Sequence, residues 1–212
     1  MLRLLQNAIG ASQSTRVHSY IIDHDVGFAP NPFHGICTLA ACKPEIRRCA
    51  KLGEYVVGTG SRPNRRQGYL IYWMQVGEIL NFDQYWSAAR FWRKRPVMRG
   101  SLMLRYGDNI YHRENGSPFF TQEDSFHSEP YGVTSVENLE RDTGRTDRVL
   151  LGRNFAYWGG NGPKVPDVLA DFVHKTQGHK NRFARERVEA FVTWIHGLPD
   201  RGLIADPTDW PG

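Results

Sequence analysis

The chain has few cysteines and no long apolar segment, and both absences narrow its class. Its 212 residues include three cysteines, Cys37, Cys42 and Cys49, an odd number within thirteen residues. A disulfide framework needs paired cysteines, so we expect a reducing compartment, namely the cytoplasm. No apolar run approaches the roughly 18 residues that cross a bilayer, so no transmembrane helix is predicted.

Several chemical signatures are also missing. With His34, the cysteines read H-x2-C-x4-C-x6-C. This pattern lacks the C-x2-C pair of structural zinc sites, so we expect buried thiols and no metal or other cofactor. The chain has no Gly-x-Ser-x-Gly elbow, and the turn after Trp158 lacks the spacing of a phosphate or dinucleotide loop. Residues 1–16 contain two arginines, no acidic residue and no cleavage-site pattern, so we expect a flexible leader.

Charge is distributed unevenly along the chain. The net charge is +5, and residues 84–107 carry six basic residues and no acidic one. Residues 108–147 then carry nine acidic against three basic residues. The two blocks could pair within the fold, or the basic one could form a phosphate-binding rim beside a polar pocket. The sequence leaves both readings open.

Apolar patterning predicts a mixed α+β domain. Strands are expected at residues 17–22, 54–58, 69–76, 148–151 and 155–158, with a basic hairpin loop at 59–68. Helices are expected to begin at Pro44, to be capped by Asp83 and run to about Trp92, and to begin at Pro166. A last helix, 181–196, has Ala184, Val188, Phe191 and Ile195 on its core stripe. The expected organisation is one domain over 17–165, with residues 166–212 packed on it as a helical extension.

The stretch from Gly107 to Ser128 is the richest in hydrogen-bonding side chains interleaved with aromatic ones. A solvated loop does not need this mixture, whereas a pocket for a flat, polar ligand does. In an extended strand Asn109 and Tyr111 would share a face, and the asparagine amide suits the edge of a base. The alternative is an Asp-Asn turn with a tyrosine in the core.

Several blocks of the sequence resemble one family in register. They are Phe-Ala-Pro-Asn-Pro-Phe at 28–33, Cys-Thr-Leu-Ala-Ala-Cys-Lys-Pro at 37–44 with Ile46-Arg47, Gly107–His112, Asp124-Ser125 with His127-Ser128, and Tyr157-Trp158-Gly159. Together they resemble the second nucleotide-modification-associated domain family over residues 19–162. The resemblance implies a bacterial or phage protein tied to systems that modify nucleic-acid bases or handle modified nucleotides, phage defence included.

A looser likeness concerns architecture. Gly53–Val57, the basic hairpin, and Tyr69–Val76 continuing into Gly77–Leu80 resemble the paired strands of PUA-like barrels, which include the EVE, YTH and ASCH families. This likeness implies a small mixed β-barrel or strongly curved sheet with peripheral helices and C-terminal helices. Such a barrel can hold one flipped base in an aromatic cleft.

Candidate site residues follow from these segments. His127 is the preferred general acid or base, with Asp124 and His112 as further catalytic candidates. Neighbours such as Asp124, Ser125 and His127 rarely form a triad, and a nucleophilic Cys37 paired with His34 or His127 is an alternative. The ligand-binding candidates are Asp25, Asn31, Phe33, Lys43, Arg47, Asp108, Asn109, Tyr111, Gln122, Ser125 and Trp158.

The leading functional hypothesis is a protein that captures a nucleotide, or nucleic acid with a modified base, in this polar and aromatic pocket. One alternative is an enzyme that modifies or hydrolyses a nucleotide or base adduct in the same pocket, because fold alone does not separate the two. A second alternative is a non-catalytic interaction subunit. A homodimer is compatible with the sequence, and a membrane partner is not expected.

Overall fold

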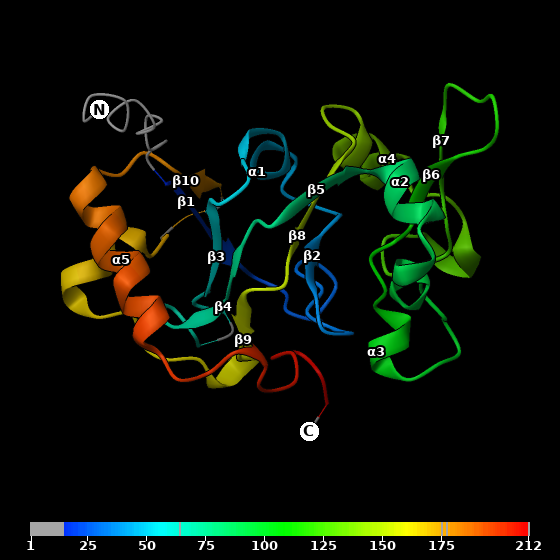
Figure 1. Ribbon diagram of the computed structural model, residues 1–212. Coiled ribbons are helices and arrows are strands. Elements are labelled where there is room, and N and C mark those ends of the chain that lie inside the picture. Colours follow the sequence, from blue (N-terminus) through cyan, green and yellow to red (C-terminus); the bar gives the residue numbers. More distant parts are fainter. Residues whose placement is uncertain (1–14, 64, 175, 177, 212) are drawn as a thin grey trace, which may run out of the picture.

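The molecule is built from stacked layers (Figure 1). The computed structural model describes residues 15–63, 65–174, 176 and 178–211; most of the predicted leader, residues 1–14, lies outside them. Helices and strands are interspersed along the chain, and the predicted mixed α+β architecture is confirmed. Within the described ranges, no helix combines the length and apolar character needed to cross a bilayer.

A six-stranded mixed sheet forms the central layer. Its strand order is β10-β1-β3-β4-β9-β11, in which β1 runs parallel to β3, β11 runs parallel to β9 and the other pairs are antiparallel. The strands are β1 (Val17–Ile22), β3 (Tyr55–Gly60), β4 (Leu70–Gln75), β9 (Phe155–Tyr157), β10 (His179–Lys180) and β11 (Gly202–Leu203). The predicted strands at 17–22, 54–58 and 69–76 and the hairpin between the last two are therefore confirmed.

A three-stranded antiparallel sheet packs on one side of the central sheet. It has the order β2-β8-β5, and β6 pairs with β7 in a separate ribbon. These strands are β2 (Cys37–Leu39), β5 (Glu78–Asn81), β6 (Tyr111–Arg113), β7 (Phe120–Gln122) and β8 (Arg148–Gly152). The chain leaves the central sheet after β4, and Gly77 N–H donates to Leu151 O as β5 joins the second sheet.

Short helices cover the outer faces of the two sheets. The α-helices are α1 (Pro44–Cys49), α2 (Phe82–Ser87), α3 (Leu102–Arg105), α4 (Val136–Thr143) and α5 (Arg185–Gly197). The 3-10 helices are η1 (Ala89–Lys94), η2 (Pro130–Gly132), η3 (Gly159–Asn161), η4 (Asp167–Phe172). Figure 1 shows α5 on one side of the central sheet and α2, α3, β6 and β7 at the opposite end of the molecule.

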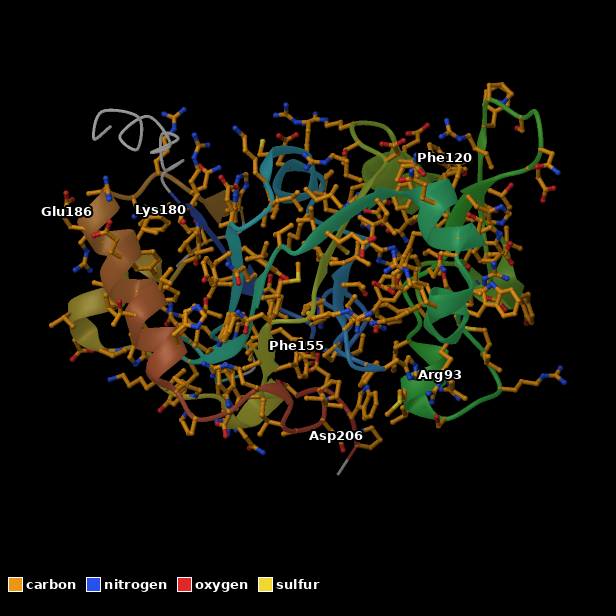
Figure 2. The ribbon with its side chains drawn as sticks, in the orientation of Figure 1. Arg93, Phe120, Phe155, Lys180, Glu186 and Asp206 are labelled. Atoms are coloured by element: carbon orange, nitrogen blue, oxygen red, sulfur yellow. The ribbon has the colours of Figure 1, made fainter. Side chains whose placement is uncertain are left out.

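Alternation of buried side chains along the strands holds the layers together. In β3, Val57 packs toward α5 and η4, whereas Val56 packs toward the second sheet. In β8, Leu150 faces the central sheet, whereas Val149 and Leu151 face α2 and β6. Both faces of these strands are thus buried, and side chains fill the space between the layers, with Phe155 near the middle of the molecule (Figure 2).

The expected barrel is not confirmed. In the part of the chain that the structure describes, the central sheet ends in the two-residue strands β10 and β11, at its opposite edges. A barrel closes only when its first and last strands pair along a common tilt. Here the second sheet covers one face of the central sheet instead, so the arrangement is layered.

Three local expectations need correction. Asn81, not Asp83, caps α2: its side chain accepts from Gln84 N–H, and Gln84 Oε1 accepts from Asn81 N–H. The helix then stops at Ser87, and 3-10 helix η1 continues to Lys94. In the last helix, Val188, Phe191 and Ile195 are buried as predicted, but Ala184 is the exposed N-cap.

A buried lysine connects η1 to the loop before β2. The Lys94 ammonium donates to Asn31 O and Oδ1, to Ile36 O and to Thr38 Oγ1 at 2.6–3.2 Å. Burial lowers the pKa of Lys94 to about 8, against the opposing effect of the Asp108 carboxylate. Asp108 in turn accepts from the Thr38 and Tyr85 hydroxyls, so one cation and one anion organise this part of the interior.

We expect Lys94→Met to destabilise the fold by about 3–5 kcal/mol, because it removes the cation that favours the ionised form of buried Asp108 and leaves the buried oxygens of Asn31 and Ile36 without their donor. The measurement is the free energy of unfolding in urea. Lys51→Met is the matched control, since Lys51 is exposed and the same change there should alter stability by less than about 0.5 kcal/mol. Equal effects of the two substitutions would contradict this role of Lys94.

Candidate active site

Cys42 lies in a strained turn between β2 and α1. Cys42 and Lys43 both adopt left-handed backbone conformations, with φ of 57° and 43°, immediately before Pro44 opens the helix. Such conformations are uncommon for residues other than glycine and mark sites whose surroundings hold them in place. Here Cys42 N–H donates to the Asp142 carboxylate at 2.9 Å, and Cys42 O accepts from Arg47 Nε at 2.9 Å.

The imidazole of His127 lies beside the Cys42 thiol. Its Nε2 is 3.5 Å from Cys42 Sγ, and its Nδ1 is 3.0 Å from Asp142 Oδ2. A proton on Nδ1 that is donated to the carboxylate leaves Nε2 as the acceptor for the thiol proton. Thiol, imidazole and carboxylate therefore form a chain in the order that activates a nucleophile.

His127 is held by the loop that carries it. Its backbone N–H donates to Ser125 Oγ, and its carbonyl oxygen accepts from Gln122 Nε2 and Asn138 Nδ2. The Phe28 ring packs 4.4 Å from the imidazole, centroid to centroid. Two residues predicted as ligand-binding, Gln122 and Ser125, thus fix the position of the predicted acid or base.

Asp142, on α4, is the buried anion of the cluster. Besides Cys42 N–H and His127, its carboxylate accepts from the Tyr111 hydroxyl at 2.9 Å and from Arg141 Nε at 3.0 Å. Burial alone would raise the pKa of Asp142, but hydrogen bonds and charge from His127 and Arg141 hold it at about 2. Burial lowers the pKa of His127, but Asp142 and Cys42 outweigh it, so the net shift is upward.

Two arginines contact the cluster, Arg47 through backbone oxygens and Arg141 through side chains. Arg47 is fully buried, and its guanidinium donates to the backbone oxygens of Cys42, Asp142 and Arg148. Arg141 is partly exposed, and its Nη2 is 3.3 Å from both ring nitrogens of His127 and 3.9 Å from Cys42 Sγ. A position equidistant from both nitrogens within the ring plane would collide with Cε1, so this guanidinium lies against a face of the imidazole.

A pocket of about 490 Å³ opens beside Cys42. That volume lies in the range of small-ligand sites. The pocket is bounded by β1 and the loop after it on one side, and by the start of α1 and by α4 on the other. Its lining residues are Tyr20, Ile21, Ile22, Asp23, His24, Ala29, Cys42, Lys43, Pro44 and Arg141.

The same three side chains are the metal-ligand candidates among the described residues. Donor atoms of Cys42, His127 and Asp142 lie within 4.8 Å of one another. However, the thiol faces Nε2 and the carboxylate faces Nδ1, so the two lie at different nitrogens of the ring. The Arg141 guanidinium also occupies the space against them, and a second cation there would be repelled. The arrangement fits proton transfer better than metal binding.

The other catalytic candidates lie elsewhere. His112 is buried, stacks on Trp86 at 4.1 Å between centroids, and places Nε2 2.7 Å from Glu123 Oε1. Asp124 is exposed and lines a shallow groove with Trp86 and Arg95. Neither residue lines the pocket beside Cys42. Their proposed catalytic roles stay predictions.

Most of the remaining candidates form intramolecular contacts. Asn31 and Asp108 belong to the Lys94 network, and Asn109 Nδ2 donates to Tyr85 O. Trp158 Nε1 donates to Asp200 at 2.8 Å. Ligand binding by these residues stays a prediction, and their described contacts tie segments of the fold together.

Two more candidates contact the C-terminal segment. The Asp25 carboxylate accepts from the Tyr157 hydroxyl and from the backbone N–H and hydroxyl of Thr208. Phe33 stacks on Trp210 with their ring centroids 5.5 Å apart. Asp206, in this segment, lies along the lower edge of the molecule in Figure 2.

The basic block is partly paired within the fold. Lys94 is buried, Arg90 lies 2.5 Å from the Glu78 carboxylate, and Arg95 packs on Trp86 and donates to its carbonyl oxygen. Arg93 and Arg99 are exposed, so part of the block is available to an anionic partner. The structure thus combines features of both sequence interpretations.

Sequence reasoning missed Asp142 and Arg141 and treated Cys42 as a buried thiol with no catalytic role. Residues 136–143 contain too few apolar residues to indicate a helix by periodicity. A charge signal was present, because Glu137 lies in the first turn, Arg141 in the last and Gly144 after it. Cys37, the predicted nucleophile alternative, is fully buried, and burial raises its pKa.

The low pKa of Asp142 has a consequence for acid stability. As pH falls from about 4 toward 2, the unfolded chain protonates this carboxyl first, so the folded state loses the contribution of its ionised form. We expect the stability difference between the wild type and Asp142→Asn to be full near pH 6 and to shrink below pH 4. Urea unfolding at both pH values measures it, and a difference that stays constant would contradict the assignment.

Comparison with known proteins places the chain in a family. The model of the family described as nucleotide modification associated domain 2 matches residues 14–212, which includes the C-terminal helix that the motif resemblance left out. Neither the curated proteins nor the solved structures contain a significant match to the chain. The likeness to PUA-like barrels is not confirmed, whereas the family match agrees with the motifs at 28–33, 37–44 and 107–112. The chain therefore belongs to the nucleotide modification associated domain 2 family.

Proposed function

We propose that this chain is a thiol-dependent enzyme of a bacterial or phage nucleotide-modification system, with Cys42 as its nucleophile. The observation that carries the proposal is the ordered contact of Cys42 Sγ with His127 Nε2, and of His127 Nδ1 with Asp142. A cysteine that served only the core would not need an imidazole and a buried carboxylate aligned behind it. A free thiol nucleophile suits a reducing compartment such as the cytoplasm.

The geometry suits attack on an acyl carbon of a nucleotide or base adduct. His127 Nε2 takes the proton of Cys42, and the thiolate attacks the carbonyl carbon of the substrate. As the C–N or C–O bond breaks, His127 returns the proton to the leaving group and a thioester forms on Cys42. Water then attacks the thioester with His127 as the base, which releases the acid and restores the thiol.

Asp142 and Arg141 support these steps differently. Asp142 holds the Nδ1 proton of His127 and stabilises the imidazolium that forms when the thiol ionises. Arg141 Nη2 is 3.9 Å from Cys42 Sγ, close enough to stabilise negative charge on the carbonyl oxygen during attack. Tyr111 donates to Asp142 and so acts as a positioning residue.

Family membership supports a substrate with a nucleotide or base component. The capture of a modified base without chemistry was the leading hypothesis from the sequence, which placed the base among the residues of Gly107–Ser128. It is the second candidate, and of the residues predicted to bind the ligand Lys43 lines the pocket beside Cys42. Two observations favour the enzyme over simple capture. Cys42 lines the pocket, and the amide group of Asn109, which was predicted to contact the base, is buried and donates to a backbone carbonyl.

The first test is selective alkylation. In the native protein we expect iodoacetamide to modify Cys42 about tenfold faster than Cys49, because among the described residues Cys42 is the cysteine with an imidazole base beside it, and to leave buried Cys37 unmodified. Peptide mass spectrometry after timed quenching gives the three rates. His127→Ala should remove the advantage of Cys42 without changing the Cys49 rate, which serves as the internal control.

The second test is turnover. We expect nucleoside 5′-monophosphates with an acetylated exocyclic amine to be deacetylated, and Cys42→Ala to reduce kcat/KM by about a thousandfold or more. Liquid chromatography with mass detection measures the product, and Cys49→Ala is the matched control. Binding of these nucleotides with no turnover by the wild type would instead support the capture alternative.

A further inference from the structure

An unpaired cation stands in the pocket beside the thiol. Lys43 lines the same pocket as Cys42, and its ammonium lies 4.9 Å from the centroid of the Tyr20 ring. Within the described residues, no carboxylate lies at ion-pair distance from this ammonium. After burial, which lowers the pKa of Lys43, the charges that act on it are those of Cys42 and Asp23, which raise it, and of Arg141, which lowers it.

Because Lys43 is partly buried, keeping its ammonium charged without an anion nearby costs free energy. Burial is the largest effect on its pKa and lowers it, which means that the protonated form is poorly solvated there. A cation in such surroundings gains more from an anion than a cation in bulk water does. Exposed lysines in the chain, such as Lys51, have no comparable setting.

Arg141, on α4, provides a second positive group in the lining of the same pocket. Its Nε and Nη2 donate to Asp142, yet the side chain is 39% exposed and lines the pocket. Asp23 is the one carboxylate among the lining residues, and His24 points its ring to solvent at the rim. The lining of the pocket therefore carries two cationic side chains, Lys43 and Arg141, and one carboxylate, whereas Asp142, the ion-pair partner of Arg141, is buried and does not line it.

We propose that Lys43 and Arg141 form an oxyanion-binding subsite, so that the substrate of Cys42 carries a phosphate group held between them. The proposal rests on the proposed function for the role of Cys42, and narrows the substrate from nucleosides and free bases to phosphorylated nucleotides. The ammonium of Lys43 binds the phosphate as a point charge, and the guanidinium of Arg141 donates hydrogen bonds from its exposed edge.

The alternative explanation is that both cations serve only to stabilise the thiolate of Cys42. The two explanations differ in one measurable respect. A thiolate-stabilising cation changes the reactivity of Cys42 toward every alkylating reagent, whereas an anion subsite changes only the reaction with anionic ones. Iodoacetate and iodoacetamide alkylate a thiol by the same reaction, but only iodoacetate carries a negative charge. The ratio of their rates therefore measures the contribution of an anion-binding subsite.

The experiment uses the full chain and compares alkylation of Cys42 by the two reagents at pH 7.5. We expect Lys43→Gln to lower the iodoacetate rate about fivefold to tenfold and to change the iodoacetamide rate less than twofold. Lys51→Gln is the matched control and should change neither. Lys43 is the chosen variant because its side chain holds no hydrogen bond in the described structure, so neutralising it leaves no hydrogen-bonding partner unsatisfied and removes only the contact with the Tyr20 ring.

Protection of Cys42 from alkylation shows whether the bound anion is free phosphate or the phosphate group of a nucleotide. Inorganic phosphate should slow iodoacetate labelling of Cys42 in the wild type, a nucleoside 5′-monophosphate should do so at lower concentration, and the matching nucleoside should not. Equal protection by nucleoside and nucleotide, or protection unchanged in Lys43→Gln, overturns the subsite.

The outcomes also separate this inference from the proposed function. A reactive Cys42 with no preference for iodoacetate and no protection by phosphate overturns the subsite and leaves the nucleophile in place. A Cys42 that reacts no faster than Cys49 with iodoacetamide overturns the nucleophile, whatever phosphate does. Loss of both iodoacetate and iodoacetamide reactivity in Lys43→Gln, with an unchanged thermal midpoint, supports thiolate stabilisation and overturns the subsite.

Discussion

The carboxylate of Asp142 is the contact on which the site depends. It joins its own helix α4, where it also pairs with the adjacent Arg141, to three other segments: the turn before α1 through Cys42 N–H, the loop of His127, and β6 through Tyr111. A buried carboxylate is stable only when its lone pairs are filled, so these segments are held at fixed separations. The same contacts that assemble this side of the molecule also align thiol and imidazole.

The layered fold explains how the thiol, the imidazole and the carboxylate come together beside the central sheet. The central sheet is buried on both faces, and α5 and η4 take one face entirely. The second sheet and its connections cover the other face. Because the strands and helices there are short, the irregular segments between them can approach one another. The pocket forms where the end of β1 meets the start of α1. Catalytic groups on connections that a rigid scaffold positions are a common solution in enzymes.

The sequence predicted the elements whose signal is local and missed the contacts that are not. Residues 17–22 are β-branched or aromatic enough to indicate a strand, and 185–197 carry the Val188, Phe191 and Ile195 stripe. His127 was singled out by its polar surroundings. Its partners Cys42 and Asp142 were not identified, because they are 100 residues apart in the sequence. They meet through a left-handed turn at residues 42–43, and neither a cysteine nor a lysine is typical of that conformation. The prediction of a barrel was not confirmed for a similar reason. The pairing of β3 with β4 is local, but the pairing of β4 with β9 joins segments that are distant in sequence.

The left-handed backbone at Cys42 and Lys43 carries an evolutionary consequence. Each such residue costs on the order of 1 kcal/mol relative to a relaxed turn, and glycine or asparagine would adopt the conformation more easily. Random substitution at these two positions would therefore tend toward more stable and chemically silent proteins. Lineages that keep cysteine and lysine at these positions would do so because selection for activity outweighs the gain in stability from other residues. This trade-off between stability and activity is common at reactive centres.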